Sequence, residues 1–124
     1  MGTWTADDLD RIGAADELLI APLRADGSLR PYITIWVVRV GDGLYVRSVR
    51  GRGGGWFRHA LERGAARIRA GGVERDVTAA EAEDADHDAI DRAYRSKYGG
   101  YPRAYVDPTV TADAIAATLR LSPR

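Results

Sequence analysis

The stretch that decides the fold covers residues 45–64 and reads YVRSVRGRGGGWFRHALERG. It begins as an apolar strand-like run and passes through arginines into three consecutive glycines. Trp56 and Phe57 follow, and apolar residues then recur at helical spacing as far as Gly64. Glycine at that point is typical of the residue that ends a helix. The stretch therefore predicts a strand, a glycine-rich loop and a short helix.

Antiparallel strands are predicted on both sides of this stretch. Upstream, residues 17–24 and 30–40 are rich in apolar, β-branched and aromatic residues, and the Asp-Gly turn at 25–28 joins them. Residues 44–49 return after a Gly-Asp-Gly turn, which gives a three-stranded meander. Downstream, residues 65–82 predict a second hairpin around a Gly-Gly turn.

Helices are predicted near both ends of the chain. Thr5 with an acidic residue three positions later predicts an N-cap for a helix over residues 5–14. Apolar residues four apart predict a second helix over residues 84–98. Glycines and prolines interrupt residues 98–108, so we expect a loop there.

The C-terminal residues supply the last predicted elements. Residues 111–117 predict a short helix, and residues 118–123 alternate like a closing strand. About six antiparallel strands outnumber the crossover helices that a parallel sheet needs. Short strands that must hide their edges favour a small barrel. We therefore expect one mainly β domain with flanking helices (α+β) over residues 1–124.

Composition narrows the range of functions. The chain has 124 residues and a formal net charge of zero, so no global field favours nucleic acid or an anionic membrane. The absence of cysteine excludes disulfides, thiolate nucleophiles and Cys-ligated metals. Neither a long apolar run nor a signal peptide is evident, so we expect a cytoplasmic protein without a membrane partner.

Charge is distributed unevenly along the chain. Residues 44–69 contain seven arginines and one acid, whereas residues 74–91 contain eight acids and one arginine. Either the basic region meets an anion, or the two regions pair with each other within the molecule.

The glycine-rich arginine loop is the first candidate site. Glycines let backbone N–H groups approach an anion, a helix N-terminus adds partial positive charge, and guanidinium groups match phosphate oxygens. The loop matches neither a Walker sequence nor a dinucleotide fingerprint, and the alternative is a plain solvated loop. Trp56 either packs in the core or flanks a planar ligand.

Other reactive side chains give weaker indications. His59 and His87 lack partners at metal-binding spacing, so no metal site is predicted. The acidic run at residues 84–88 lacks the glycine and terminal glutamate of a calcium loop and is better interpreted as a helix cap. No serine lies in a nucleophile elbow. The tyrosines at 94, 98, 101 and 105 either pack under the loop or line a pocket.

Several of these segments carry a family resemblance. GRGGGWFRHALE and RIRAGGVERDV resemble the central part of the FMN-binding split-barrel superfamily, which includes pyridoxamine-phosphate-oxidase-like proteins and deazaflavin-dependent nitroreductases. IDRAYRSKYGGYP and TLRLSPR are similar to a subgroup of small bacterial domains of unassigned function. The nitroreductase pattern has an Asn after the helix-opening aromatics, where this chain reads His59-Ala60-Leu61.

The resemblance implies a six-stranded antiparallel split β-barrel that forms a homodimer and binds FMN or a deazaflavin at the subunit interface. The implied cofactor-binding residues are Arg47, Ser48, Arg50, Gly51 and Arg52 at the phosphate, Trp56 at the pocket edge, and Thr34 and Trp36 at the ring. Catalytic residues stay unassigned, with Tyr98, Tyr101 and His59 as candidates.

Two functions follow as hypotheses. The first is a flavin- or deazaflavin-dependent oxidoreductase, nitroreductase-like, that acts on a small conjugated or aromatic substrate. The second is a relative without a cofactor, either a small-molecule-binding protein or an acid-base biosynthetic enzyme of the cyclase or isomerase type. A purely structural barrel is the third and plainest alternative.

Overall fold

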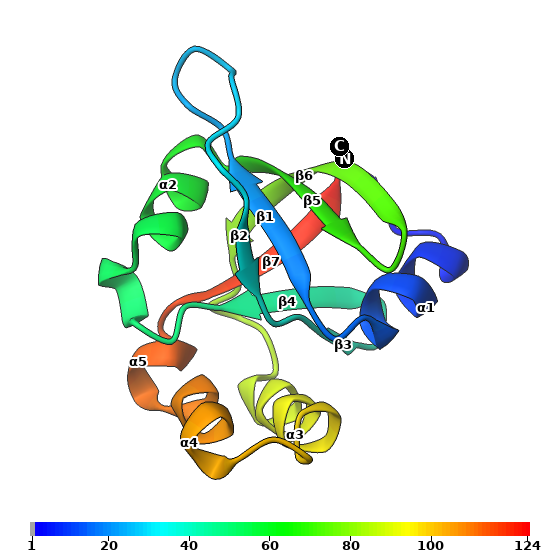
Figure 1. Ribbon diagram of the computed structural model, residues 1–124, viewed down its shortest axis with the longest axis vertical. Coiled ribbons are helices and arrows are strands. Elements are labelled where there is room, and N and C mark those ends of the chain that lie inside the picture. The colour runs from blue at the N-terminus through cyan, green and yellow to red at the C-terminus, as the bar shows by residue number, and fades with distance from the viewer. Residues whose placement is uncertain (1) are drawn as a thin grey trace.

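A computed structural model of the chain describes residues 2–124 and consists of one curled antiparallel sheet with helices around it (Figure 1). The sheet order is β2-β1-β5-β6-β7-β4-β3. The strands are β1 (Leu18–Pro22), β2 (Ile33–Ile35), β3 (Val38–Val40), β4 (Gly43–Arg47), β5 (Ala65–Ala70), β6 (Val73–Glu81) and β7 (Thr118–Pro123). The mainly β class and both predicted hairpins are confirmed, with the second hairpin formed by β5 and β6.

The two edge strands of the sheet, β2 and β3, follow one another in the chain. β2 pairs with β1 and β3 pairs with β4, although only two residues separate β2 from β3. The sheet therefore curls until its edges face each other, and a bent stretch of chain links them. We call this junction at Trp36 and Val37 the seam.

The prediction of one long strand over residues 30–40 is wrong, and the seam explains why. Tyr98 Oη accepts a hydrogen bond from the Val37 backbone N–H at 3.2 Å, and Lys97 Nζ donates to the Val37 carbonyl at 2.7 Å. Both backbone groups of Val37 are thus satisfied by side chains instead of a neighbouring strand. The break divides one predicted strand into two, so the sheet has seven strands instead of six.

The helices are α1 (Ala6–Ala14), α2 (Gly55–Arg63), α3 (His87–Lys97), α4 (Arg103–Val106) and α5 (Ala112–Ile115), with 3₁₀ turns η1 (Gly51–Gly53) and η2 (Asp107–Val110). Thr5 caps α1 by accepting from the Asp8 N–H, as predicted. Gly64 ends α2 in the left-handed conformation, at φ 66°. No helix within residues 2–124 is long and apolar enough to cross a membrane.

The loop predicted over residues 98–108 is in part wrong, because α4 and η2 form there. Pro102 occupies the N-cap of α4, and Pro108 lies in the first turn of η2. Prolines are tolerated at these positions because the first turn of a helix leaves its N–H groups unpaired. Together α3, α4, η2 and α5 form a helical cap, residues 87–115, which lies beside one end of the barrel in Figure 1.

Two apolar clusters hold the barrel and the cap. One fills the barrel interior, where Leu44 and Val46 of β4 are fully buried. The other joins the cap to the outer face of β3 and β4 through Val38, Tyr45 and Tyr94. Because side chains alternate along a strand, β4 contributes to both clusters and is buried on both faces.

Removing the Tyr98 hydroxyl tests the seam. Tyr98→Phe loses the bond from Val37 and the 2.8 Å bond to the Asp16 carbonyl, so we expect a loss of about 1–3 kcal/mol in the free energy of unfolding. Urea denaturation measures it. The matched control is Tyr101→Phe, since Tyr101 is exposed and its hydroxyl makes no hydrogen bond within residues 2–124. Equal effects of the two changes would contradict this role.

The single lysine of the chain gives a pH-dependent prediction. Burial lowers the pKa of the Lys97 ammonium from its ordinary value of 10.5 to about 8, against a weaker opposing effect of Asp16. Between these two values the unfolded chain holds a proton that the folded protein has released, so stability rises with pH. We expect wild-type protein to gain unfolding free energy relative to Lys97→Met between pH 7.5 and 9.5, as measured in urea. A constant difference would rule this out.

Candidate functional site

A pocket of about 300 Å³ opens at the seam between the barrel wall and the cap. We call it the seam pocket. Its lining residues are Thr34, Ile35, Trp36, Arg47, Val49, Trp56, Tyr94, Tyr105 and Thr109. β2 and the seam supply the wall, α2 supplies Trp56, and the cap supplies the last three residues. Most of the lining is apolar or aromatic, which is typical of a site for a planar organic ligand.

Trp36 is held in place at the seam by other aromatic rings. Its indole stacks on Tyr98 with ring centroids 3.9 Å apart and planes 2° apart, and Tyr101 leans on it at 5.2 Å. Parallel stacking of this kind fixes the orientation of an aromatic side chain. On the side of Trp36, stacking thus orients the wall of the seam pocket.

Beneath the seam pocket lies the guanidinium of Arg47, with no exposed side-chain surface. It donates to Asp91 Oδ1 on α3 at 2.5 Å, to the Thr109 carbonyl on η2 at 2.9 Å and to Thr118 Oγ1 on β7 at 3.0 Å. Its remaining nitrogen lies 3.3 Å from His87 Nδ1. Arg47 was predicted as a phosphate ligand, yet its donors are already used inside the protein.

The glycine-rich loop, predicted as an anion-binding site, leads into α2 beside the seam pocket. Gly54 is the N-cap of α2 and provides no side-chain acceptor, so the first-turn N–H groups of α2 lack a cap. Ser48 Oγ is buried without a hydrogen-bond partner in the described chain, and it lies so close to Gly54 that a Cβ there would sit 2.3 Å from it. Nothing lies within 4 Å of a Cβ built on Gly53 or Gly55. Exposed amides and an unpaired hydroxyl are a suitable setting for an anion.

The other arginines of the loop point elsewhere. Arg52 pairs with Glu81 and donates to the Ala116 carbonyl at 2.9 Å, so it lies on the side of the loop away from the seam pocket. Arg50 is exposed and forms no ion pair within residues 2–124. Gly51 is buried at φ 72°, a conformation that favours glycine.

Pairing within the molecule explains most of the charge asymmetry. The pairs that join the basic region to the acidic region are Arg47–Asp91, Arg52–Glu81, Arg67–Asp76 and Arg69–Glu74. Four of the seven arginines are used in this way. For these four arginines, the alternative that the basic and acidic regions pair within the molecule is therefore correct.

The three catalytic candidates do not converge. Tyr98 is buried at the seam, its hydroxyl is committed to backbone groups, and burial raises its pKa to about 12. Tyr101 is exposed beside Trp36. His59 lies on α2 and lines a different hollow, which the seam pocket meets only at Trp56.

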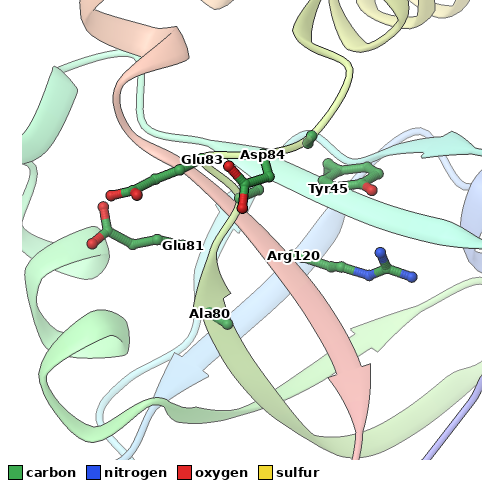
Figure 2. A pocket seen from close by; sticks show the side chains of 8 residues that line it. Tyr45, Ala80, Glu81, Glu83, Asp84 and Arg120 are labelled. Carbon is green, nitrogen blue, oxygen red and sulfur yellow. The ribbon is translucent and has the colours of Figure 1, made fainter.

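A wider hollow of about 460 Å³ lies along the β6–α3 connection, and Figure 2 shows the side chains that line it. The carboxylates of Glu81 and Glu83 lie on one side of it, and the Arg120 guanidinium points away from them. Excess negative charge disfavours a phosphorylated ligand there. Within residues 2–124, no three histidine or acidic side chains are placed to hold a metal ion.

Only some residues of the seam pocket carry a signal in the sequence. Val49 and Thr109 carry no motif, and their positions depend on how the cap meets the barrel. Tyr94 and Tyr105 belong to the tyrosine group for which pocket lining was one alternative, and both line it. The Tyr94 hydroxyl is buried without a hydrogen-bond partner in the described chain, and burial raises its pKa, so it stays protonated.

The broken antiparallel barrel with a pocket at its seam defines a split-barrel protein, as the resemblance implied. Within that class, the chain belongs to the family described as "Uncharacterized protein conserved in bacteria (DUF2255)", whose profile matches residues 8–121. No functionally curated protein matches the sequence.

Solved structures share this fold at low identity. A FAD- and heme-binding protein from Mycobacterium smegmatis is 22% identical with a TM-score of 0.54, and the match covers 95% of this chain but 65% of that one. An F420 reductase is 13% identical with a TM-score of 0.58, over 94% of this chain and 92% of that one. The heme storage protein HutZ from Vibrio cholerae is 13% identical with a TM-score of 0.58, over 100% and 92%.

Substitution of Arg47 tests whether its buried charge joins the cap to the barrel. Arg47→Met leaves Asp91 and the Thr109 carbonyl without their donor, so we expect the free energy of unfolding to fall by about 3–5 kcal/mol in urea. Arg63→Met is the control, because Arg63 is exposed and unpaired within residues 2–124; its effect should stay within about 0.5 kcal/mol. A loss at Arg47 no larger than that of the control would disprove the role.

Proposed function

We propose that the seam pocket binds a flavin-type cofactor, FMN or a deazaflavin, and that the protein is an oxidoreductase for a small conjugated or aromatic substrate. The observation that supports this most is the proximity of an aromatic pocket to an uncapped helix N-terminus with an unpaired buried hydroxyl, Ser48 Oγ. The named structural neighbours, which include a FAD- and heme-binding protein and an F420 reductase, support it through the shared fold.

The planar ring system would lie between Trp36 and Trp56, against Thr34 of the barrel wall. Trp36 is already oriented by its stack on Tyr98, so little conformational entropy is lost when a ring binds beside it. The buried Tyr94 hydroxyl can donate to a carbonyl oxygen of the ring. When bound, a flavin or deazaflavin supplies hydride transfer, while the protein provides orientation and electrostatics.

The phosphate would lie at the start of α2. There the backbone N–H groups after Gly54 and the hydroxyl of Ser48 are available, and Gly51 lets the loop turn tightly beneath them. Arg50 is free to swing over the anion, whereas Arg52 reaches it only by exchanging its bond to Glu81. Arg47 takes part as a positioning residue, since its guanidinium holds the cap that closes the pocket.

A homodimer is part of the proposal. Large apolar side chains rim the seam pocket on the open side: Val49 is 54% exposed and Tyr105 is 63% exposed. Apolar rims of this kind mark interaction surfaces. A second copy of the chain over this rim would shield the cofactor from water.

One observation favours the cofactor-free alternative. The resemblance implies four polar side chains at the phosphate. Two of them, Arg47 and Arg52, already form ion pairs within the protein. A pocket that has given up these contacts still suits a neutral aromatic ligand, which fits a small-molecule-binding protein.

Cofactor titration separates these functions. We expect purified protein to bind FMN or a deazaflavin, seen as quenching of the Trp36 and Trp56 fluorescence, and to bind FMN more tightly than riboflavin, which lacks the phosphate. Arg50→Ala with Arg52→Ala should weaken FMN binding by about 1.5 kcal/mol or more, because Arg50 is free to contact the phosphate and each charged hydrogen bond contributes roughly 1.5–3 kcal/mol, and should leave riboflavin binding unchanged.

The control is Arg58→Ala with Arg63→Ala, which removes two exposed arginines from α2. Equal losses in both double variants would indicate a general effect of charge, not a phosphate site. A colourless protein that binds neither cofactor would favour the cofactor-free alternative.

A further inference from the structure

A second hollow of about 290 Å³ lies on the other side of Trp56, between the β1–β2 hairpin and α2. We call it the hairpin pocket. Its lining residues are Pro22, Arg30, Pro31, Ile33, Gly55, Trp56 and His59. Trp56 is the one residue that it shares with the seam pocket. The two hollows are therefore separate sites divided by a single indole.

Among the residues that the structure describes, none forms a hydrogen bond or an ion pair with the Arg30 guanidinium. Arg30 is half-buried, it forms no ion pair within residues 2–124, and its Nε is buried without a hydrogen-bond partner there. A buried donor without an acceptor is costly, and an unpaired guanidinium in apolar surroundings costs more. Its planar fork matches the two oxygens of a carboxylate.

His59 also lines this hollow, and one of its nitrogens is unsatisfied. It lies on α2, and its Nδ1 is buried without a partner in the described chain. Arg30 and His59 are the only ionisable residues that line the hairpin pocket, and no acid lies among its lining residues. The described lining thus contains one guanidinium and one imidazole, and no carboxylate that would repel an anion.

Apolar surfaces make up the remainder of the lining. Ile33 is 43% exposed on an edge strand, and Pro31 and the half-buried indole of Trp56 lie beside it. One guanidinium and one imidazole suit a single negative charge, and these walls suit an apolar or aromatic body.

We infer that the hairpin pocket binds a small aromatic carboxylate, with its carboxylate at Arg30 and His59 and its ring against Ile33 and Trp56. This site does not require a cofactor in the seam pocket, because neither Arg30 nor His59 lines that pocket. Should a cofactor bind there, the carboxylate ligand would lie just across Trp56 from it.

Benzoate titration into the ¹⁵N-labelled full-length protein, without cofactor, tests the inference. We expect saturable shifts of the Gly55 amide and the Trp56 indole N–H, and much weaker shifts with benzyl alcohol, which has the ring but no charge. Arg30→Gln should weaken benzoate binding by about tenfold or more, since charged hydrogen bonds contribute roughly 1.5–3 kcal/mol. His59→Gln should weaken it less, because one nitrogen is replaced by an amide.

Arg58→Gln is the matched control: it removes an exposed arginine next to His59 and should change the affinity less than about twofold. Arg30→Lys serves as a second variant that keeps the charge but loses the fork, and we expect intermediate binding. Benzoate shifts away from the hairpin pocket, or equal losses in Arg30→Gln and Arg58→Gln, would overturn the assignment, whatever the outcome of FMN binding.

Discussion

One buried guanidinium connects the parts of this molecule. Arg47 lies at the end of β4 and reaches α3, η2 and β7 at once. A charge without solvent exposure has to keep its partners, because removing them leaves it uncompensated in a medium of low dielectric. The cap is therefore held over the outer face of β4 by electrostatics as well as by the apolar cluster around Tyr94. The seam pocket exists because that cap stays in place, since Tyr94, Tyr105 and Thr109 form one of its sides.

Hydrogen-bond partners within the molecule distinguish the charges with a structural role from the groups that are available for function. Arginines that reach an acid, such as Arg47 and Arg52, have their donors satisfied within the molecule. Three of the unsatisfied groups belong to residues near Trp56: Ser48 Oγ lies near the start of α2, and Arg30 Nε and His59 Nδ1 belong to residues that line the hairpin pocket. Native proteins leave few buried polar groups unpaired, so each of these groups calls for a partner, either water or a ligand. The glycine-rich loop lies between these two places and lets the backbone approach both.

Local signals made much of the fold predictable. The Thr5 cap, the Gly64 helix end and the Gly-Gly turn of the β5–β6 hairpin act over a few residues, and each appears as expected. The break at Val37 depends on Lys97 and Tyr98, about 60 positions later, so no local pattern shows it. The candidate site also combines local signals with contacts between distant residues. Thr34, Trp36 and Trp56, which the resemblance implies as cofactor-binding residues, line one pocket, whereas the internal use of Arg47 depends on Asp91, 44 positions away.

The most direct test of the buried junction is native-state hydrogen exchange on wild-type protein and Arg47→Met. If Arg47 holds the cap, amide protection in α3, η2 and α5 should fall in the variant while β5 and β6, which do not contact it, keep theirs. Uniform loss of protection over the whole chain, or unchanged protection in the cap, would contradict the central claim that this one side chain fixes the cap and with it the seam pocket.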